Sequence, residues 1–135
     1  DTLSKRVRHD RLKSDVIDMR QRMRQKLDKS DSEYFDLKQG KGGIGDIEFI
    51  VQYLVLSNAA DASSVYFYSD NIRQLDALAA AGFLDAGAAE RLQQIYKRYR
   101  LRLHHLALDD RTALVSDDEF PVEREFVEDL WKQVL

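Results

Sequence analysis

The pattern of apolar and polar positions predicts two helices in the first half of the chain. Apolar residues recur at steps of four and three between residues 12 and 27, the spacing of one stripe on an amphipathic helix. These residues are Leu12, Val16, Met19, Met23 and Leu27. After a polar stretch, a short run over 34–38 and a glycine cluster, residues 47–56 read IEFIVQYLVL and are apolar on nearly every side. This second segment is expected to be a buried central helix.

Three further helices are predicted in the second half. Ser69 or Asp70 can cap the first, which Gly82 terminates. Its apolar residues are Ile72, Leu75, Leu78 and Ala79. Asp85 caps the longest helix, which carries the stripe Leu92, Ile95, Tyr96, Tyr99, Leu103 and Leu106. The last begins near Pro121 and carries Val127, Leu130, Trp131 and Val134. The fold class is therefore all-α, a single bundle of about five helices with a glycine-rich turn before the buried central helix.

Length and composition set limits on the class of protein. The chain has 135 residues, the size of one domain, and it contains no Cys, which excludes disulfides and thiolate chemistry. No apolar run approaches the roughly 18 residues of a membrane span, and the basic N-terminus lacks the apolar stretch of a signal peptide. A soluble, cytoplasmic protein that does not bind a membrane is expected. Because the chain starts at Asp1 and its first Met is Met19, we expect either a piece of something larger or a protein from which a tag has been trimmed.

Charge is unevenly placed and leaves two binding hypotheses open. Residues 1–29 carry 10 Lys or Arg against 5 Asp or Glu, whereas residues 30–135 carry 11 against 19. The basic residues within 5–29 could bind nucleic acid weakly, although a solvated helix face explains them as well, and no nucleic-acid partner is predicted. The longest helix also has a basic face, which would suit a stand-alone helical protein-interaction module. That face consists of Lys97, Arg98, Arg100 and Arg102.

Four of the six glycines fall within residues 40–45, directly before the central helix. They satisfy the dinucleotide fingerprint formally, but the buried strand and βαβ unit that it requires are not predicted. A weaker possibility is that free N–H groups of residues 42–46, with Lys38 and Lys41, hold an anion at the helix N-terminus. The alternative is a flexible turn into a buried helix, with Asp46 as N-cap or first-turn acid.

Polar residues in the central helix mark a candidate contact edge. Glu48 and Gln52 are four apart, and Gly45 lies three before Glu48, so all three project from one edge of an otherwise apolar helix. An unpaired buried carboxylate is unfavourable, so this edge must meet partners within the bundle, water or another domain.

The sequence offers no catalytic or metal-ligating set. His104 and His105 are adjacent and point about 100° apart on a helix, so they cannot chelate one ion together. The acidic residues within 109–119 are expected to be a solvated loop and helix start. No Ser/His/Asp set is defined by spacing.

The run FDLKQGKGGIGDIEFIVQYLVL (35–56) closely resembles the signature of the bifunctional glutamine synthetase adenylyltransferase/adenylyl-removing enzyme family. The segments 69–82 and 101–108 and the closing helix also resemble its extreme C-terminal helical domain. The similarity runs from about Asp15 onward. Gly45 departs from the family, which usually has a side chain there, so the role of this position stays open.

The resemblance implies an enzyme that uses ATP and Mg²⁺ to transfer AMP to a tyrosine of glutamine synthetase. A second catalytic half would remove the AMP by phosphorolysis, under control of the PII signal protein and glutamine. Such transferases hold their metals on a Gly-Ser motif and an Asp-x-Asp pair on a mixed sheet. This chain has no Gly-Ser dipeptide and no strand is predicted to carry one, so the catalytic domain is expected upstream.

The chain itself is therefore expected to be an accessory domain over residues 1–135, with 1–14 as a candidate linker. Alone it should be inactive and bind neither cofactor tightly. Its expected partners are the upstream catalytic domain, glutamine synthetase and PII. The residues expected to border the active site or the domain interface are Lys38, Lys41, Gly42, Gly43, Asp46, Glu48 and Gln52.

Overall fold

The computed structural model describes the backbone of residues 2–58 and 71–135 and the side chains of residues 11–57 and 71–135. Its helices and strands, in chain order, are α1 (Thr2–Leu27), β1 (Tyr34–Asp36), α2 (Ile44–Asn58), α3 (Asn71–Ala80), α4 (Ala86–Leu108), β2 (Leu114–Ser116) and α5 (Pro121–Val134). The five helices of the described ranges confirm the predicted fold class. The cap predicted at Ser69 or Asp70 lies outside the described residues. Residues 2–14 belong to α1. Helical structure does not test whether this segment links two domains, and the linker at 1–14 stays a prediction.

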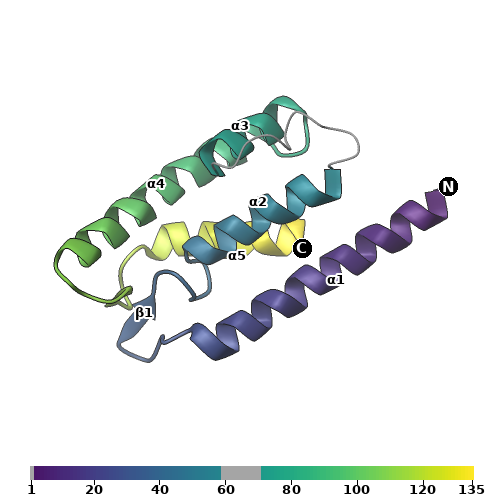
Figure 1. Cartoon of the computed structure of the whole chain (residues 1–135). Coiled ribbons are helices and arrows are strands. Elements are labelled where there is room, and N and C mark those ends of the chain that lie inside the picture. Colours follow the sequence, from purple (N-terminus) through teal and green to yellow (C-terminus); the bar gives the residue numbers. More distant parts are fainter. Residues whose placement is uncertain (1, 59–70) are drawn as a thin grey trace.

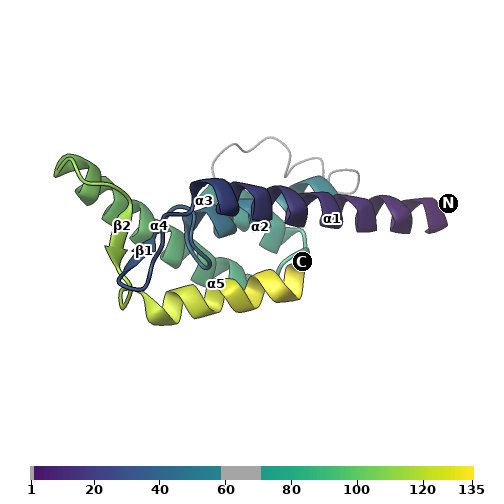
Figure 2. The same cartoon turned by 90° about the horizontal axis from the view of Figure 1, so that it is seen from below.

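Helix α2 is the centre of the bundle, as its apolar sequence predicts. It contacts α1, α3, α4 and α5, which lie around it in Figures 1 and 2. The side chains that fill the core from α2 are at most 9% exposed; they are Ile47, Ile50, Val51, Leu54 and Val55. The glycine-rich turn leads directly into this helix. Hence any group fixed by the turn is fixed relative to the whole core.

Helices α3 and α4 form an antiparallel hairpin with capping residues that the sequence predicted. Gly82 ends α3 in the left-handed region, with φ +82°, and the N–H of Phe83 donates to the Leu78 carbonyl. Asp85 caps α4, because its carboxylate accepts from the Ala88 N–H at 3.0 Å. The predicted stripe of α4 packs into the core, with Leu103 only partly buried.

The apolar stripe predicted on α1 is divided between two faces, which corrects the sequence interpretation. Leu12 and Val16 pack against the core, but Met19 is 57% exposed and Leu27 46% exposed. The position that continues the inward face is Arg20, four residues after Val16, and it is fully buried. Helix α1 is therefore turned so that an arginine, and not a methionine, faces α2.

A two-stranded antiparallel sheet, which the sequence analysis did not predict, joins the two halves of the chain. Strand β1 pairs with β2 so that Phe35 lies opposite Val115, and both side chains are buried. The acidic stretch 109–119, expected as loop and helix start, thus contains β2. The sheet holds the entrance of the glycine-rich turn against the start of α5 (Figure 2).

Candidate functional site

Asp46, in the first turn of α2, binds two arginines of α1. Its Oδ1 accepts from Arg20 Nε at 2.7 Å and from Arg24 Nη2 at 2.6 Å, and its Oδ2 accepts from the Gly42 N–H at 2.8 Å. Arg20 also donates to the side chain of Gln39 at 2.8 Å and to its carbonyl at 3.1 Å. We call these five residues the Asp46 cluster. It is largely buried, and it fixes the rotation of α1 against the glycine-rich turn.

The backbone N–H groups of the glycine-rich turn are already used inside the protein. Gly42 donates to Asp46, Gly43 to the Gly40 carbonyl, Ile44 to the Leu37 carbonyl and Gly45 to the Lys38 carbonyl. The anion site suggested by the sequence needs these donors to be free. The N–H groups of residues 42–45 are therefore not available to a phosphate in this conformation.

Two glycines of the turn are required by close approach to neighbouring elements. A Cβ on Gly45 would lie 2.5 Å from the Lys38 carbonyl oxygen and 2.8 Å from Arg20 Nη2, so a side chain here needs Arg20 to move. Gly42 combines φ +81° with a hypothetical Cβ 2.6 Å from the Arg124 carbonyl oxygen. Its own carbonyl accepts from the buried Tyr99 hydroxyl at 2.8 Å. The turn is thus a packed junction of α1, α4 and α5 rather than a flexible hinge.

The aspartate of the FDLK run organises the entrance of the turn. Asp36 Oδ1 accepts from the N–H groups of Lys38 and Gln39, at 3.0 and 3.1 Å, and Oδ2 accepts from the Lys29 N–H at 3.2 Å. The side chain is only 5% exposed. Such side-chain caps favour turns over extended structure. Asp36 therefore determines where the Lys38 side chain emerges.

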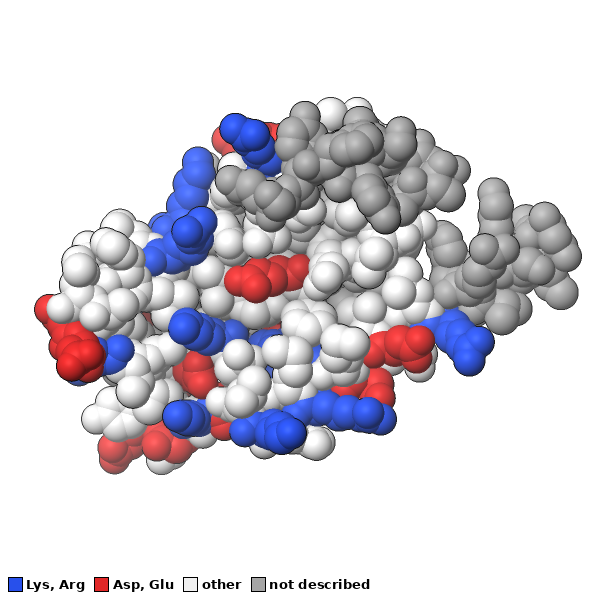
Figure 3. Space-filling model, viewed as in Figure 1, with Lys and Arg blue, Asp and Glu red and all other residues white. Residues whose placement is uncertain are grey.

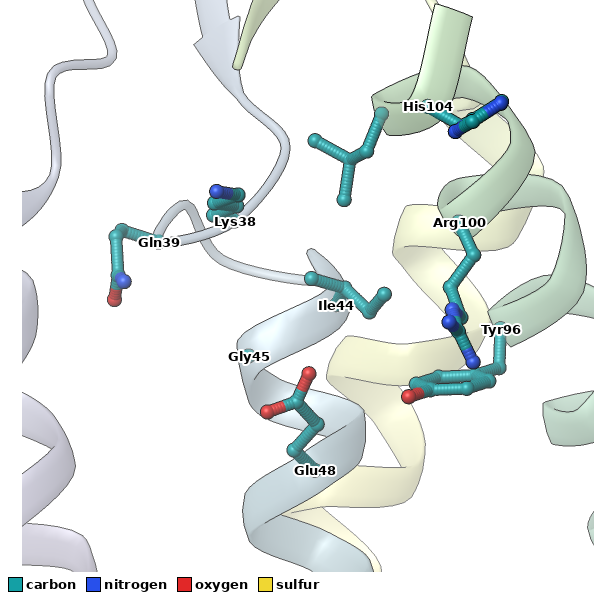
Figure 4. Close-up of a pocket in the computed structure, with 9 residues that line it drawn as sticks. Lys38, Gln39, Ile44, Gly45, Glu48, Tyr96, Arg100 and His104 are labelled. Atoms are coloured by element: carbon teal, nitrogen blue, oxygen red, sulfur yellow. The ribbon is translucent and has the colours of Figure 1, made fainter. Parts of the chain in front are cut away.

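An open pocket of about 500 Å³ lies between the turn, α2 and α4. Figure 4 shows Glu48 on α2 facing Tyr96 and Arg100 on α4, with Lys38 and Gln39 on the opposite side and His104 at the end. The other lining residues are Ile44, Gly45 and Leu103. Of the predicted site residues, the structure brings Lys38 and Glu48 together here.

The remaining predicted site residues lie elsewhere. Lys41 and Gln52 are exposed and do not line this pocket. Gly42, Gly43 and Asp46 are buried in the turn beside it. The two arginines of the Asp46 cluster were not predicted as site residues, although the four-residue spacing from Leu12 through Val16 to Arg20 is a signal for an inward-facing cation.

Glu48 is the carboxylate of the pocket, and it forms no hydrogen bond or ion pair with another described side chain. Although it is accessible to solvent, crowding by neighbouring atoms desolvates it and raises its pKa above the ordinary value. The positive charges of Arg20, Arg100 and Lys38 act in the opposite direction but do not cancel this rise. Ionised Glu48 is therefore under-solvated in this chain, which suits a group that receives a cationic or hydrogen-bonding partner.

We expect Glu48→Gln to stabilise the isolated chain slightly at pH 7. Because the folded pKa of Glu48 is raised, its contribution to stability is full below the unfolded pKa and is lost as pH rises through the folded value. The advantage of glutamine should thus shrink as the pH falls to about 4, near the ordinary glutamate pKa. Urea unfolding at both pH values measures it, with the exposed Glu90→Gln as control. A clear loss of stability at pH 7 would show that Glu48 has a partner within the bundle.

The basic surfaces behind the two binding hypotheses are partly neutralised inside the domain. On α4, Arg98 lies 3.7 Å from Glu123, Arg102 forms two hydrogen bonds with Glu119, and Arg100 lies over the Tyr96 ring. On α1, Asp46 binds two arginines, and an exposed pair joins Arg22 to Asp18. This pairing favours neither nucleic-acid binding nor a purely electrostatic docking face.

The part of the chain that the structure describes does not fit a magnesium site. It contains no group of three or more His, Asp or Glu side chains placed to hold a metal. Both oxygens of Asp46 accept hydrogen bonds, and Glu48 has no second acid beside it in the pocket. Within the same described ranges, none of the helices combines the length and apolarity needed to cross a membrane.

The sequence that forms this bundle and its glycine-rich turn matches the model of a known family. The family model described as GlnD PII-uridylyltransferase matches residues 10–128, and this chain belongs to that family. The match includes α2, the glycine-rich turn, and every residue of the Asp46 cluster and the pocket.

Curated relatives define the nearer group within this class, and they carry a different enzyme name. Three of them are bifunctional glutamine synthetase adenylyltransferase/adenylyl-removing enzymes, which confirms the resemblance seen in the sequence. The relative from Methylococcus capsulatus is 48% identical over 90% of this chain, that from Nitrosococcus oceani 43% over 93%, and that from Mannheimia haemolytica 40% over 92%. The chain spans 13% of the length of each.

Proposed function

We propose that this chain is an accessory helical domain of a longer enzyme that transfers AMP from ATP to a tyrosine of glutamine synthetase. The observation that carries the proposal is 48% identity across 90% of the chain to an enzyme of that name, of which the chain spans 13%. In this proposal the other half of the enzyme removes AMP by phosphorolysis. The two activities together regulate nitrogen assimilation.

The catalytic groups of the proposed enzyme belong to another domain of the longer polypeptide. The described residues provide no cluster of acids that fits the Mg²⁺ of AMP transfer, and their buried carboxylate Asp46 is occupied by arginines. ATP and Mg²⁺ are thus assigned to an upstream nucleotidyltransferase domain. Glutamine synthetase is the substrate, and PII is a regulatory partner of the whole enzyme.

The pocket is the part of this domain that we assign to the border of the catalytic cleft. Glu48 is accessible and desolvated, its carboxylate is not hydrogen-bonded to any other described residue, and Lys38 and Arg100 line the same pocket with two positive charges. The Asp46 cluster lies directly beneath and holds the turn that carries Lys38. These features support a polar surface that contacts the catalytic domain and that the Asp46 cluster keeps in a fixed conformation. In this proposal Glu48 binds and orders a basic residue of the catalytic domain.

The 135-residue chain alone is expected to transfer no AMP. Two-metal phosphoryl chemistry needs carboxylates that place the metals about 4 Å apart, and the described part of this chain offers none. Incubation with labelled ATP, Mg²⁺ and glutamine synthetase should leave the substrate unlabelled, whereas the longer enzyme labels it. Label transfer by the repurified 135-residue chain would overturn the assignment as an accessory domain.

In the longer enzyme, Glu48→Gln is expected to reduce AMP transfer to glutamine synthetase about tenfold. This corresponds to about 1.4 kcal/mol, the scale of one lost charge-assisted hydrogen bond at a domain border. Initial rates with saturating ATP measure the effect. Glu90→Gln, an exposed acid on α4, is the matched control and should keep the wild-type rate. Equal rates for both variants would remove Glu48 from the border of the cleft.

A further inference from the structure

The outer face of α1 carries an apolar stripe that none of the described elements covers. Met19 is 57% exposed and Leu27 46% exposed, with Met23 partly exposed between them. Together they line a shallow groove of about 360 Å³. Large apolar side chains grouped at helical spacing on a surface mark interaction sites more often than single ones do. Methionine in particular adapts its shape to a partner.

The exposure of this stripe follows from the way α1 is anchored. Arg20 is fully buried and is bound by Asp46 and Gln39, so α1 cannot rotate without breaking the Asp46 cluster. Met19 precedes Arg20 by one residue and therefore points about 100° away from it. Met23 cannot turn inward either, because Arg24 is held by the same carboxylate. The stripe is thus fixed outward by buried hydrogen bonds.

Charges of opposite sign lie toward the two ends of the stripe, so the surface favours one direction of a partner helix. Asp15 and Asp18 lie toward the N-terminal end of the groove, and Arg22 and Lys26 lie toward the C-terminal end. Figure 3 shows the same separation, with acidic side chains followed by a run of basic ones along α1. An antiparallel partner helix would meet this pattern with acids in its N-terminal half and bases in its C-terminal half. Its own macrodipole favours that arrangement.

We infer that this face, defined by Met19, Met23 and Leu27, docks an antiparallel amphipathic helix from another part of the same longer polypeptide. This inference rests on the proposed function only in assuming that the chain is one domain of a longer protein. The curated relatives have 87% of their length outside the match, so the occupant has an abundant source within the same molecule. The docked helix would clamp α1 and so connect the Asp46 cluster to the rest of the enzyme.

The two methionines of the chain allow a direct test, because both lie on this face. In the longer protein, hydrogen peroxide should oxidise Met19 and Met23 about tenfold more slowly than in the same protein unfolded in urea, since sulfoxide formation follows exposure. Peptide mass spectrometry resolves the two sites. Oxidation of native Met19 at the unfolded rate would overturn the inference.

A charge-reversal variant tests the direction of docking. Asp15→Lys with Asp18→Lys in the longer protein should restore oxidation of Met19 toward the unfolded rate, because the basic half of the partner would then face lysines. Glu125→Lys with Asp129→Lys, two exposed acids on α5, is the matched control and should leave Met19 protected. Unchanged protection in the first variant would exclude the antiparallel arrangement.

A second copy of this chain is the main rival occupant, since the charge pattern of α1 is complementary to itself. Protection by self-association falls on about a hundredfold dilution, whereas protection within one polypeptide does not. Loss of protection on dilution would therefore overturn the inference. None of these measurements uses AMP transfer, so failure of the proposed function and failure of this docking site give different results.

Discussion

Asp46→Asn is expected to lower the free energy of unfolding of the chain by about 3 to 5 kcal/mol, because it leaves buried arginines without their counter-ion. Arg20 is fully buried and donates to the Asp46 carboxylate at 2.7 Å, and Arg24 donates to the same oxygen. The amide retains the shape of the carboxylate, so the loss comes from charge rather than from a cavity. For a domain with about 5 to 15 kcal/mol of total stability, this loss is a large fraction of the free energy of unfolding.

Urea unfolding followed by circular dichroism measures this effect. Asp18→Asn is the matched control, because Asp18 and its partner Arg22 are 57% and 78% exposed. An exposed pair of this kind contributes at most about 0.5 kcal/mol. If the two variants unfolded at the same urea concentration, the Asp46 cluster would not be what holds α1 in place.

Gly42→Ala is expected to cost about 2 to 5 kcal/mol, because left-handed backbone strain adds to overlap with α5. The new Cβ would lie 2.6 Å from the Arg124 carbonyl oxygen and 2.9 Å from its Cα, and backbone atoms cannot swing aside as a flexible side chain can. Either the turn or α5 must move. Movement of the turn would also weaken the hydrogen bond from Tyr99 to the Gly42 carbonyl.

Gly82→Ala separates the two causes. Gly82 has φ +82°, nearly that of Gly42, but nothing lies within 4 Å of its hypothetical Cβ. It should therefore lose only the strain energy, about 1 to 2 kcal/mol. The difference in unfolding midpoints between the two alanine variants measures the close approach of the turn to α5. Equal midpoints would mean that this approach relaxes at no cost.

The parts of the fold that sequence could predict are those set by neighbouring residues. The end of α3 and the start of α4 could be predicted, because Gly82 and the N-cap Asp85 each act within one turn of the helix that they limit. The central position of α2 followed from its nearly continuous apolar composition. The start of α5 followed from Pro121, whose ring suits the first turn of a helix.

The parts that could not be predicted depend on contacts between distant segments. Strands of three residues are too short to show an alternating pattern, so β1 and β2 had no signal of their own. The division of the α1 stripe depends on Asp46, which lies 26 positions from Arg20. Apolar periodicity predicts that Met19 is buried and Arg20 exposed. The buried carboxylate of Asp46 binds Arg20, and the opposite is observed.

In the candidate site, too, the features set by neighbouring residues could be predicted and those set by distant contacts could not. Lys38 and Glu48 were singled out from the sequence because they flank the glycine-rich turn and interrupt an apolar helix. Their position opposite Arg100 and Tyr96 in the pocket needs α4 to lie beside α2, which no local pattern specifies. The sequence left open whether the N–H groups of the turn could bind an anion, because their acceptors within the turn depend on its full conformation.

The small sheet also imposes an order on the assembly of the domain. Helices α2, α3 and α4 lie between its strands in the sequence, and the entropy of closing so long a loop opposes strand pairing until these helices have collapsed together. The α3–α4 hairpin needs only its short connection and should form early. The Leu37 N–H donates to the Ala113 carbonyl next to the sheet, so the adjoining turn should become ordered late. The pocket walls at Lys38 and Gln39 would then be among the last surfaces of this domain to form, and a nascent chain would present this face only after β2 had been synthesised.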